Sequence, residues 1–347
     1  MTGRARIKEI ASLANVGSAT VDRVIHGRSH VSDATRQKVL QAKSAIESGA
    51  WTVRSPRPWH LKVILPEMAG LSTEYLAQCF NEFGALGNAI VECAFSPKLE
   101  PAALARKLRN CGSGKWDVVI FQALEDPRVR DAVSYLNNRG VPCLSLLSPL
   151  PNAPVIGFVG SDGRAAGRTA GLLMGLACPH GGEVVIISGG QLYRSHENRE
   201  MGFRSYLRSH AKHLKILETV LGHDTAEQNH ENLSRIIRNT PGLVGLYNVG
   251  GGNEGVVRAL CEANLTSEIC VIAHNLTPRT RSHLGEGIFQ FILHQDMRLM
   301  AERAINVCLN YLINGQSDNI HVPVEIITRE NLEPRDNGQQ TLNSLPP

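Results

Sequence analysis

The chain has 347 residues, of which 42% are hydrophobic and 20% are charged. This composition is typical of a soluble globular protein, and the length suffices for two or three compact units. No apolar run approaches the length of a membrane span, and the first residues contain no secretory signal, so we expect a cytoplasmic protein. The eight cysteines are scattered without a C-x-x-C pair, which favours reduced, buried thiols over a disulfide framework or a zinc site.

Positive charge is concentrated at the start of the chain. Residues 1–60 contain ten Lys or Arg and four Asp or Glu, a net charge of +6, whereas residues 61–347 contain 26 bases and 28 acids, a net charge of −2. Such asymmetry suits phosphate contact at one end of the molecule. A solvated pair of terminal helices is the alternative, and six net charges alone do not exclude it.

The first fifty residues predict a helix-turn-helix. The first helix is indicated by apolar residues at helical spacing, namely Ile7, Ile10, Ala11 and Leu13. Val16 and Gly17 break this pattern, Ser18 is expected as the N-cap of the next helix, and a second apolar set follows at Val21, Val24 and Ile25. A third helix is predicted from Ser32 to Glu47, with Ser32 as its cap and with Val39, Leu40 and Ile46 on its inner face. In such an arrangement the second helix enters the DNA major groove.

After a proline-containing linker, the pattern changes to short apolar runs alternating with helical segments. Strands are predicted at 61–65, 89–95, 118–122, 142–147, 155–160, 184–188, 214–222, 243–249, 269–273 and 288–293. Helices are predicted at 73–86, 101–110, 127–139, 163–177, 197–210, 225–238, 251–263 and 297–314. This alternation indicates parallel sheets with right-handed crossovers. Ten strands are more than one small doubly wound domain needs, so we expect two sheets, with ligands bound where the carboxyl ends of their strands meet.

Taken together, these features resemble the LacI/GalR family of transcriptional regulators, from Ile7 to about Ile327. The most specific motif is the run A-N-V-G-S-A-T-V-D-R-V-I-H-G at 14–27, followed by Val31-Ser32 and Thr35-Arg36. The body is similar to ribose-type periplasmic sugar-binding proteins through Gly160-Ser161-Asp162, the run R-E-M-G-F at 199–203 and the turn N-L-T-P at 275–278.

The resemblance implies the domain limits. It predicts a helix-turn-helix domain at 1–50, a linker at 51–60 and an effector-binding and dimerisation domain at 61–340, of the periplasmic-binding-protein-like type I fold. The first subdomain is expected at about 61–160 plus 296–330, and the second at 161–295.

For DNA binding, the resemblance implies a reading helix from Ser18 to Ile25. Ser18 and Ala19 fall where family members choose base contacts, and Arg23 matches a base-contacting arginine, a residue that can bond guanine in bidentate fashion. Phosphates or neighbouring base edges are expected to be contacted by Arg6, Thr20, His26, Ser32 and Thr35. The family's hinge helix is not expected, because Pro56 and Pro58 oppose it; Arg54 and Arg57 are expected to touch the DNA backbone or minor groove, with a plain spacer as the alternative. Asp22 is unexpected beside DNA and would pair with a basic neighbour.

For the effector, the resemblance implies a cleft lined by polar groups that bond sugar hydroxyls. The candidates are Tyr75, Asp162, Tyr193, Arg194, His196, Glu197, Arg199, Asn248, Asn253, Asn275, His294 and Gln295. Asp162 has helix capping as its alternative role, and Glu197 occupies the slot where the family carries a sugar-binding arginine. Leu147-Ser148 replaces the ribose-type aspartate-arginine pair, so a monosaccharide other than ribose, or a related polyol, is expected.

One rival motif is the run G-G-G-N-E-G at 250–255, which satisfies G-x-G-x-x-G between a strand and a helix. No acidic residue follows about 20 residues later, which argues against a NAD-dependent oxidoreductase. A solute-binding protein without a DNA role is the other alternative.

We expect no enzyme, no cofactor and no metal, but a repressor of a carbohydrate operon. Its partners would be pseudo-palindromic operator DNA, a small sugar and a second copy of the chain, as a homodimer or a tetramer.

Overall fold

The computed structural model describes residues 7, 10–11, 14, 16–28, 31–47 and 57–332. Its first part is a small helical head that contains α2 (Ser18–Ile25) and α3 (Asp33–Glu47). Its core is closed by the buried side chains of Ile10, Ala11, Ala14, Val21, Val24, Val39 and Ala42. Ser32 Oγ accepts a hydrogen bond from the Thr35 backbone N–H at 3.3 Å, so Ser32 caps α3 as predicted.

Three details of the head differ from the sequence prediction. Gly17, not Ser18, is the N-cap of α2, so Ser18 is the first helical residue. Leu40 is 48% exposed and Ile7 is 37% exposed, although both were predicted to face inward. Leu40 directly follows the fully buried Val39, and consecutive helical residues point about 100° apart, so both cannot face the same core. The expectations for Leu13 and for the side chain of Ile46 lie outside the described residues.

The first sheet of the body has six strands in the order β12-β5-β4-β3-β1-β2, all parallel. The strands are β1 (Trp59–Pro66), β2 (Ala89–Ser96), β3 (Val118–Gln122), β4 (Cys143–Leu146), β5 (Gly157–Gly160) and β12 (Asp318–His321). One face packs against α4 (Leu71–Leu86) and α12 (Met297–Asn314), and the other against α5 (Pro101–Asn110) and α6 (Pro127–Asn137). The central strands β3, β4 and β5 are almost entirely buried because helices cover both of their faces, whereas the edge strands β2 and β12 are partly exposed.

The second sheet has seven strands, in the order β13-β11-β10-β9-β6-β7 with β8 also paired to β6. The strands are β6 (Gly182–Ser188), β7 (Leu214–Ile216), β8 (Val220–Leu221), β9 (Leu243–Asn248), β10 (Cys270–His274), β11 (Phe291–Gln295) and β13 (Val324–Ile327). Only β13 is antiparallel to its neighbour. The helices are α7 (Gly163–Ala177), α8 (Arg194–His210), α9 (Ala226–Asn239), α10 (Asn253–Ala263) and α11 (Pro278–Gly285). Side chains of α7 and α8 share one core cluster, and those of α9, α10 and α11 share another.

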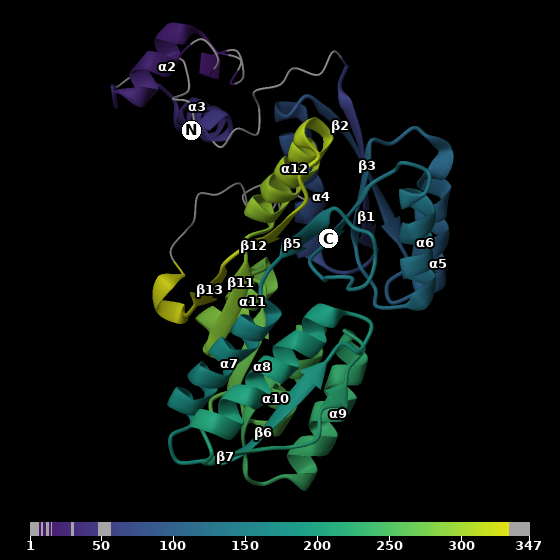
Figure 1. The fold of residues 1–347 in the computed structure, drawn as a ribbon. Coiled ribbons are helices and arrows are strands. Elements are labelled where there is room, and N and C mark those ends of the chain that lie inside the picture. Colours follow the sequence, from purple (N-terminus) through teal and green to yellow (C-terminus); the bar gives the residue numbers. More distant parts are fainter. Residues whose placement is uncertain are drawn as a thin grey trace.

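The chain crosses between the two sheets three times, after β5, after β11 and after β12 (Figure 1). The third crossing was not predicted. It places β13 beside β11 in the second sheet, so 324–327 do not belong to the first subdomain as expected. Two further differences concern local structure: the single strand expected at 214–222 is split into β7 and β8, and α11 was missed.

None of the helices in the described part of the chain is long and apolar enough to cross a membrane. All eight cysteines are free thiols; six of them are buried, Cys93 is half-buried and Cys261 is exposed, so the expectation of burial is wrong for Cys261.

Candidate functional site

The exposed face of α2 carries the predicted base-reading residues. Ser18, Ala19 and Arg23 are exposed, while Val21 and Val24 on the opposite face are buried in the head core. The helix therefore presents one short polar face with one guanidinium group, which is the arrangement that bidentate readout of a guanine requires. Thr20 is half-buried beside this face.

The residues predicted to touch phosphates lie around the turn after α2 and at the start of α3. His26 and Ser32 are exposed and Thr35 is half-buried. The Thr35 hydroxyl lies 2.8 Å from that of Ser32. Asp22 pairs with Arg28 at 3.1 Å and lies 3.0 Å from His26 Nδ1, so its carboxylate has the basic neighbour that we expected. Arg6 and Arg54 lie outside the described residues.

The linker enters the body through an ion pair that the sequence did not predict. Arg57 donates two hydrogen bonds to Asp117, from Nη1 to Oδ2 at 2.9 Å and from Nη2 to Oδ1 at 2.6 Å. The backbone N–H of His60 donates to the same carboxylate at 2.8 Å. These donors lower the pKa of Asp117 below its usual value, against the opposing effect of burial, the largest single influence. The Arg57–Asp117 pair thus ties the end of the linker to the start of β3.

Loops at the carboxyl ends of both sheets touch one another. Lys98, after β2, donates from Nζ to the carbonyl of Asp224, after β8, at 3.2 Å. The Glu125 backbone N–H donates to the Leu192 carbonyl at 2.7 Å, and the Ser195 N–H donates to Ser148 Oγ at 3.3 Å. The strand ends of the two subdomains therefore form one junction, which is where parallel α/β folds bind ligands. We call Lys98, Glu125, His196, Asp224 and Asn248 the inter-sheet site.

Buried polar atoms without a hydrogen-bond partner gather near this junction. In the described part of the chain they include Ser96 Oγ, Glu125 Oε2, Ser161 Oγ, His196 Nδ1 and Asn248 Oδ1. Each belongs to the carboxyl end of a strand or to the segment that follows it. A buried polar atom left unpaired costs about 1–3 kcal/mol, so native proteins keep such atoms mostly where a ligand or water completes them. The site is thus equipped to hydrogen-bond a polar molecule.

Asp224 is the residue that sequence reasoning missed. Its side chain is only 8% exposed, its backbone φ is +54°, and its Oδ1 accepts a hydrogen bond from the Gly251 N–H at 2.8 Å. A Cβ at Gly250 would lie 2.0 Å from this oxygen, and one at Gly189 would lie 2.1 Å from it. The glycine-rich turn therefore surrounds a carboxylate of its own chain, which accounts for the G-x-G-x-x-G pattern without a dinucleotide. The usable signal was the position of Asp224 just beyond a strand end.

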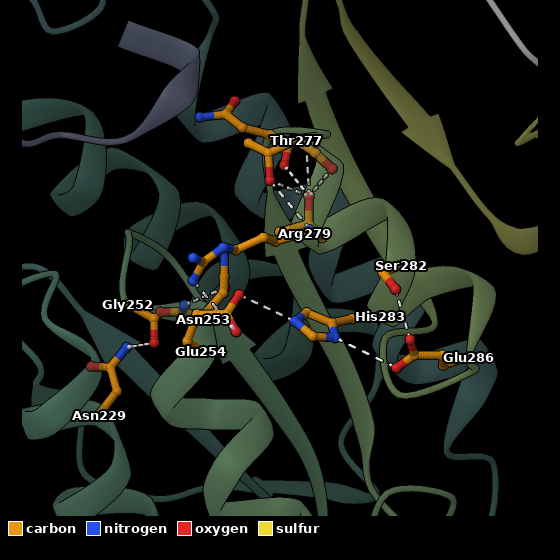
Figure 2. Close-up of polar contacts among 12 residues, drawn as sticks. Asn229, Gly252, Asn253, Glu254, Thr277, Arg279, Ser282, His283 and Glu286 are labelled. Atoms are coloured by element: carbon orange, nitrogen blue, oxygen red, sulfur yellow. Dashed lines mark hydrogen bonds and ion pairs between the residues drawn. The ribbon is translucent and has the colours of Figure 1, made fainter. Parts of the chain in front are cut away.

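The same turn is fixed by a buried amide. Asn229, in α9, donates from Nδ2 to the carbonyls of Gly251 and Gly252, each at 3.0 Å. Figure 2 shows the contact with Gly252. Figure 2 also shows His283 of α11 between two carboxylates, with Nε2 at 3.2 Å from Glu254 of α10 and Nδ1 at 3.7 Å from Glu286. These contacts hold α9, α10 and α11 together behind the site.

The start of α8 supplies two buried cleft candidates, His196 and Arg199. Burial lowers the pKa of His196 to about 4, so the ring is neutral at pH 7. Arg199 is 7% exposed and donates from Nη1 to the carbonyl of Val249 at 2.8 Å; burial lowers its pKa too. The close approach of α7 to α8 fixes their position, because a Cβ at Gly167 would lie 1.9 Å from the Arg199 carbonyl oxygen.

The amide candidates form a second group at the ends of β9, β10 and β11. Asn248 donates from Nδ2 to Asn253 Oδ1 at 2.7 Å, and Gln295 donates from Nε2 to Asn275 Oδ1 at 3.0 Å. Asn248 and Gln295 are 1% and 3% exposed. The Leu276 N–H donates to His294 Nδ1 at 3.2 Å, so this ring nitrogen is engaged by the protein. Amides held in this way present fixed donors and acceptors, which suits recognition of hydroxyl groups.

Five other predicted candidates have partners of their own. Asp162 Oδ1 accepts from the Ala165 N–H at 3.0 Å and caps α7, the alternative role considered for it. Arg194 and the exposed Glu197 form an ion pair at 2.7 Å. Tyr193 is 4% exposed and packs into the apolar cluster of the first subdomain, although α8 belongs to the second. Tyr75 packs against the cluster beneath α4, and burial raises its pKa to about 12.

This geometry defines a class of protein: a two-subdomain α/β binding protein that carries a helix-turn-helix head. Residues 76–317 match the family model of the periplasmic binding protein domain, so the chain belongs to that family, and residues 6–47 match the model of bacterial regulatory proteins of the lacI family. The chain is thus a DNA-binding regulator of the kind that the sequence resemblance predicted. These are families of regulators and binding proteins, not of enzymes, which agrees with the expected absence of catalysis.

Solved structures with the same fold include sugar-binding proteins and a regulator. The glucose-galactose binding protein GanP from Geobacillus stearothermophilus is 18% identical, with a TM-score of 0.75 over 80% of this chain and 99% of that one. A solute-binding protein from Burkholderia graminis, in complex with D-arabinose, is 20% identical, with a TM-score of 0.76 over 81% and 99%. A candidate LacI transcriptional regulator from Bacteroides fragilis is 20% identical, with a TM-score of 0.72 over 80% and 99%. No curated protein sequence matches significantly. At these identities the likeness establishes the fold alone.

Proposed function

We propose that the protein is a repressor whose operator binding responds to a monosaccharide bound between its two subdomains. One observation carries the proposal: a lacI-type head and a buried, incompletely hydrogen-bonded polar site lie on the same chain. Sugar hydroxyls need paired donors and acceptors, which the amides of Asn248, Asn275 and Gln295 offer. Two structural relatives, a glucose-galactose binding protein and a solute-binding protein in complex with D-arabinose, support a sugar over other polar ligands.

In the head, we assign base reading to Ser18, Ala19 and Arg23, and phosphate contact to Thr20, His26, Ser32 and Thr35, with Arg6 and Arg54 as further contacts. Arg57 is assigned to the linker, because Asp117 already holds its guanidinium group in two hydrogen bonds. A homodimer would place two heads on the half-sites of a pseudo-palindromic operator.

The regulatory step follows from the contacts across the junction. A ligand that bonds groups from both subdomains favours one relative orientation of the two sheets. In a dimer this orientation sets the separation of the two heads and hence their fit to two half-sites. Release of the operator on sugar binding is the direction we propose.

Two measurements test this function. In operator binding, Arg23→Ala should reduce discrimination at one base pair by about 1–3 kcal/mol, or roughly 5- to 150-fold, while sugar binding persists. The exposed Lys212→Ala, at the far end of the second subdomain, is the matched control and should change neither property. Equal loss of both properties in Arg23→Ala would contradict the assignment of separate roles to head and body.

The ligand is tested by thermal shift with pentoses, hexoses and ketoses, alongside amino acids and purines. A sugar should raise the melting temperature of the wild type, and the rise should disappear in Asn248→Ala. Stabilisation by amino acids or purines alone would refute the sugar assignment. The sugar that stabilises the protein should also reduce its affinity for the operator, because we propose that the ligand relieves repression.

A further inference from the structure

We propose that the first subdomain itself binds the DNA backbone, through a basic rim formed by Arg106, Arg109, Lys115 and Arg139. This inference rests on the proposed DNA-binding function and extends it from the head to the body. The partner is duplex DNA next to the operator half-sites, contacted through phosphates and not through bases.

Topology brings the rim to the side of the body that the linker enters. β1 and β3 are parallel, so Trp59 and Val118 begin at the same end of the first sheet. α5 and α6 return antiparallel to the strands, so their carboxyl termini lie at this same end. Arg109 is in the last turn of α5, Arg139 follows α6, and Lys115 precedes β3. The inter-sheet site lies at the opposite end of these strands, toward the second subdomain (Figure 1).

Two arginines of the rim are held in place by a shared aromatic ring. The guanidinium carbons of Arg109 and Arg139 lie 5.3 Å and 4.7 Å from the ring centroid of Tyr135. Arg139 also donates from Nη1 to the Gly112 carbonyl at 3.3 Å. Within the described residues neither arginine forms an ion pair with a carboxylate, and both are exposed. Ordered, exposed guanidinium groups without an acidic partner are well suited to phosphate oxygens.

Two acids close to the rim already have basic partners. Asp117 is paired with Arg57, and Glu92 is paired with both Lys62 and Lys115, the latter at 3.1 Å. Arg106, Arg109 and Arg139 therefore add unbalanced positive charge. The body as a whole does not share this excess, since residues 61–347 carry a net charge of −2. The rim is thus a local feature and not the effect of a generally basic body.

The linker limits how far the operator can lie from the rim. Arg57 is fixed to Asp117, and nine residues separate it from Glu47 at the end of α3. A chain of that length spans at most about 35 Å even when fully extended. The linker therefore tethers the DNA-bound head to the end of the body that carries the rim, and each phosphate contact there would strengthen binding without regard to base sequence.

The test is the salt dependence of operator binding by the full-length protein. Each lost phosphate contact reduces the slope of log K against log salt by about 0.9, so Arg109→Gln/Arg139→Gln should reduce it by about 1.8 per protomer, or about 3.6 for an operator-bound homodimer. Nonspecific DNA should show the same reduction. Arg109→Lys/Arg139→Lys retains the charge and should keep the wild-type slope, which separates charge from any effect on folding.

A matched control lies at the equivalent end of the second sheet, where Lys212 precedes β7 and Arg238 is near the end of α9; both are exposed. Lys212→Gln/Arg238→Gln removes the same charge and should leave the slope unchanged. A wild-type slope in Arg109→Gln/Arg139→Gln would overturn the proposal, as would an equal reduction in the control. In either case an operator footprint of the wild-type protein would still support the proposed function. A wild-type protein that gives no footprint on any operator would refute the proposed function itself.

Discussion

A single methyl group at Gly167 should test whether the contact between α7 and α8 positions the site. Gly163, Gly167, Gly171 and Gly175 recur every fourth residue along α7 and all face α8 or its carboxyl end. A Cβ at Gly167 would lie 1.9 Å from the Arg199 carbonyl oxygen and 2.9 Å from the Phe203 nitrogen. Both neighbours are backbone atoms, so the helices must separate by about 1.5 Å for the shorter distance to reach the 3.4 Å of ordinary van der Waals contact.

Overpacking of this kind costs about 1–3 kcal/mol, and a clash with backbone belongs at or above the upper end. Replacing a helical glycine by alanine returns about 1 kcal/mol of helix propensity. The net destabilisation in Gly167→Ala is therefore about 2 kcal/mol. For a unit of the size of the second subdomain, this lowers the melting temperature by about 4–8 °C. Because His196 and Arg199 lie in the displaced part of α8, ligand binding should weaken as well.

Gly175→Ala is the control on the same helix face. There the new Cβ would lie 3.1 Å from the Ala211 Cβ, a contact that a shift of a few tenths of an ångström relieves. We expect a melting temperature within about 2 °C of the wild type, since the propensity gain offsets the tight contact. Thermal unfolding followed by circular dichroism measures both variants. If Gly167→Ala has the same melting temperature as Gly175→Ala, the contact between α7 and α8 does not position the site.

Three further predictions concern single contacts. Between pH 6.5 and about 4 the unfolded chain binds a proton at His196 that the folded chain does not, so the free energy of unfolding should fall on acidification by up to about 1.4 kcal/mol per pH unit. Urea unfolding at pH 7 and pH 5 should show a smaller loss of stability in His196→Gln than in the wild type. An equal loss in both would contradict a buried, neutral His196 ring. Gly250→Ala would place a Cβ 2.0 Å from Asp224 Oδ1 and so displace this carboxylate. Calorimetry should show ligand affinity reduced at least tenfold, while operator affinity is unchanged. Unchanged ligand affinity would show that the Asp224 carboxylate is not part of the binding site. Asp117→Asn should weaken the hold on Arg57 and change operator affinity with no effect on ligand affinity; a plain spacer would leave both unchanged.

Local pattern sufficed to predict most of the framework. The pattern of apolar residues predicted β3, α5, α7 and α12 at their observed bounds, because each is a regular segment with a buried face or, for β3, a continuous buried run. The family resemblance supplied the base-reading residues of the head and the candidates at the ends of β9, β10 and β11. Weakly patterned segments were missed: β12 has three exposed residues among its four, and α11 has only two buried residues. Such segments owe their structure to neighbours and not to their own periodicity.

The sequence by itself determined that a basic three-helix head precedes a body of two parallel sheets, since charge distribution and hydrophobic period are properties of the chain alone. Only the tertiary structure decided which polar groups meet. Asp224 faces Lys98 from 126 residues away, Arg57 reaches Asp117 across 60, and the glycines at 250–252 make room for a carboxylate rather than a dinucleotide. Such contacts depend on the register and crossing of strands far apart in the chain, and no local pattern of residues encodes either of them.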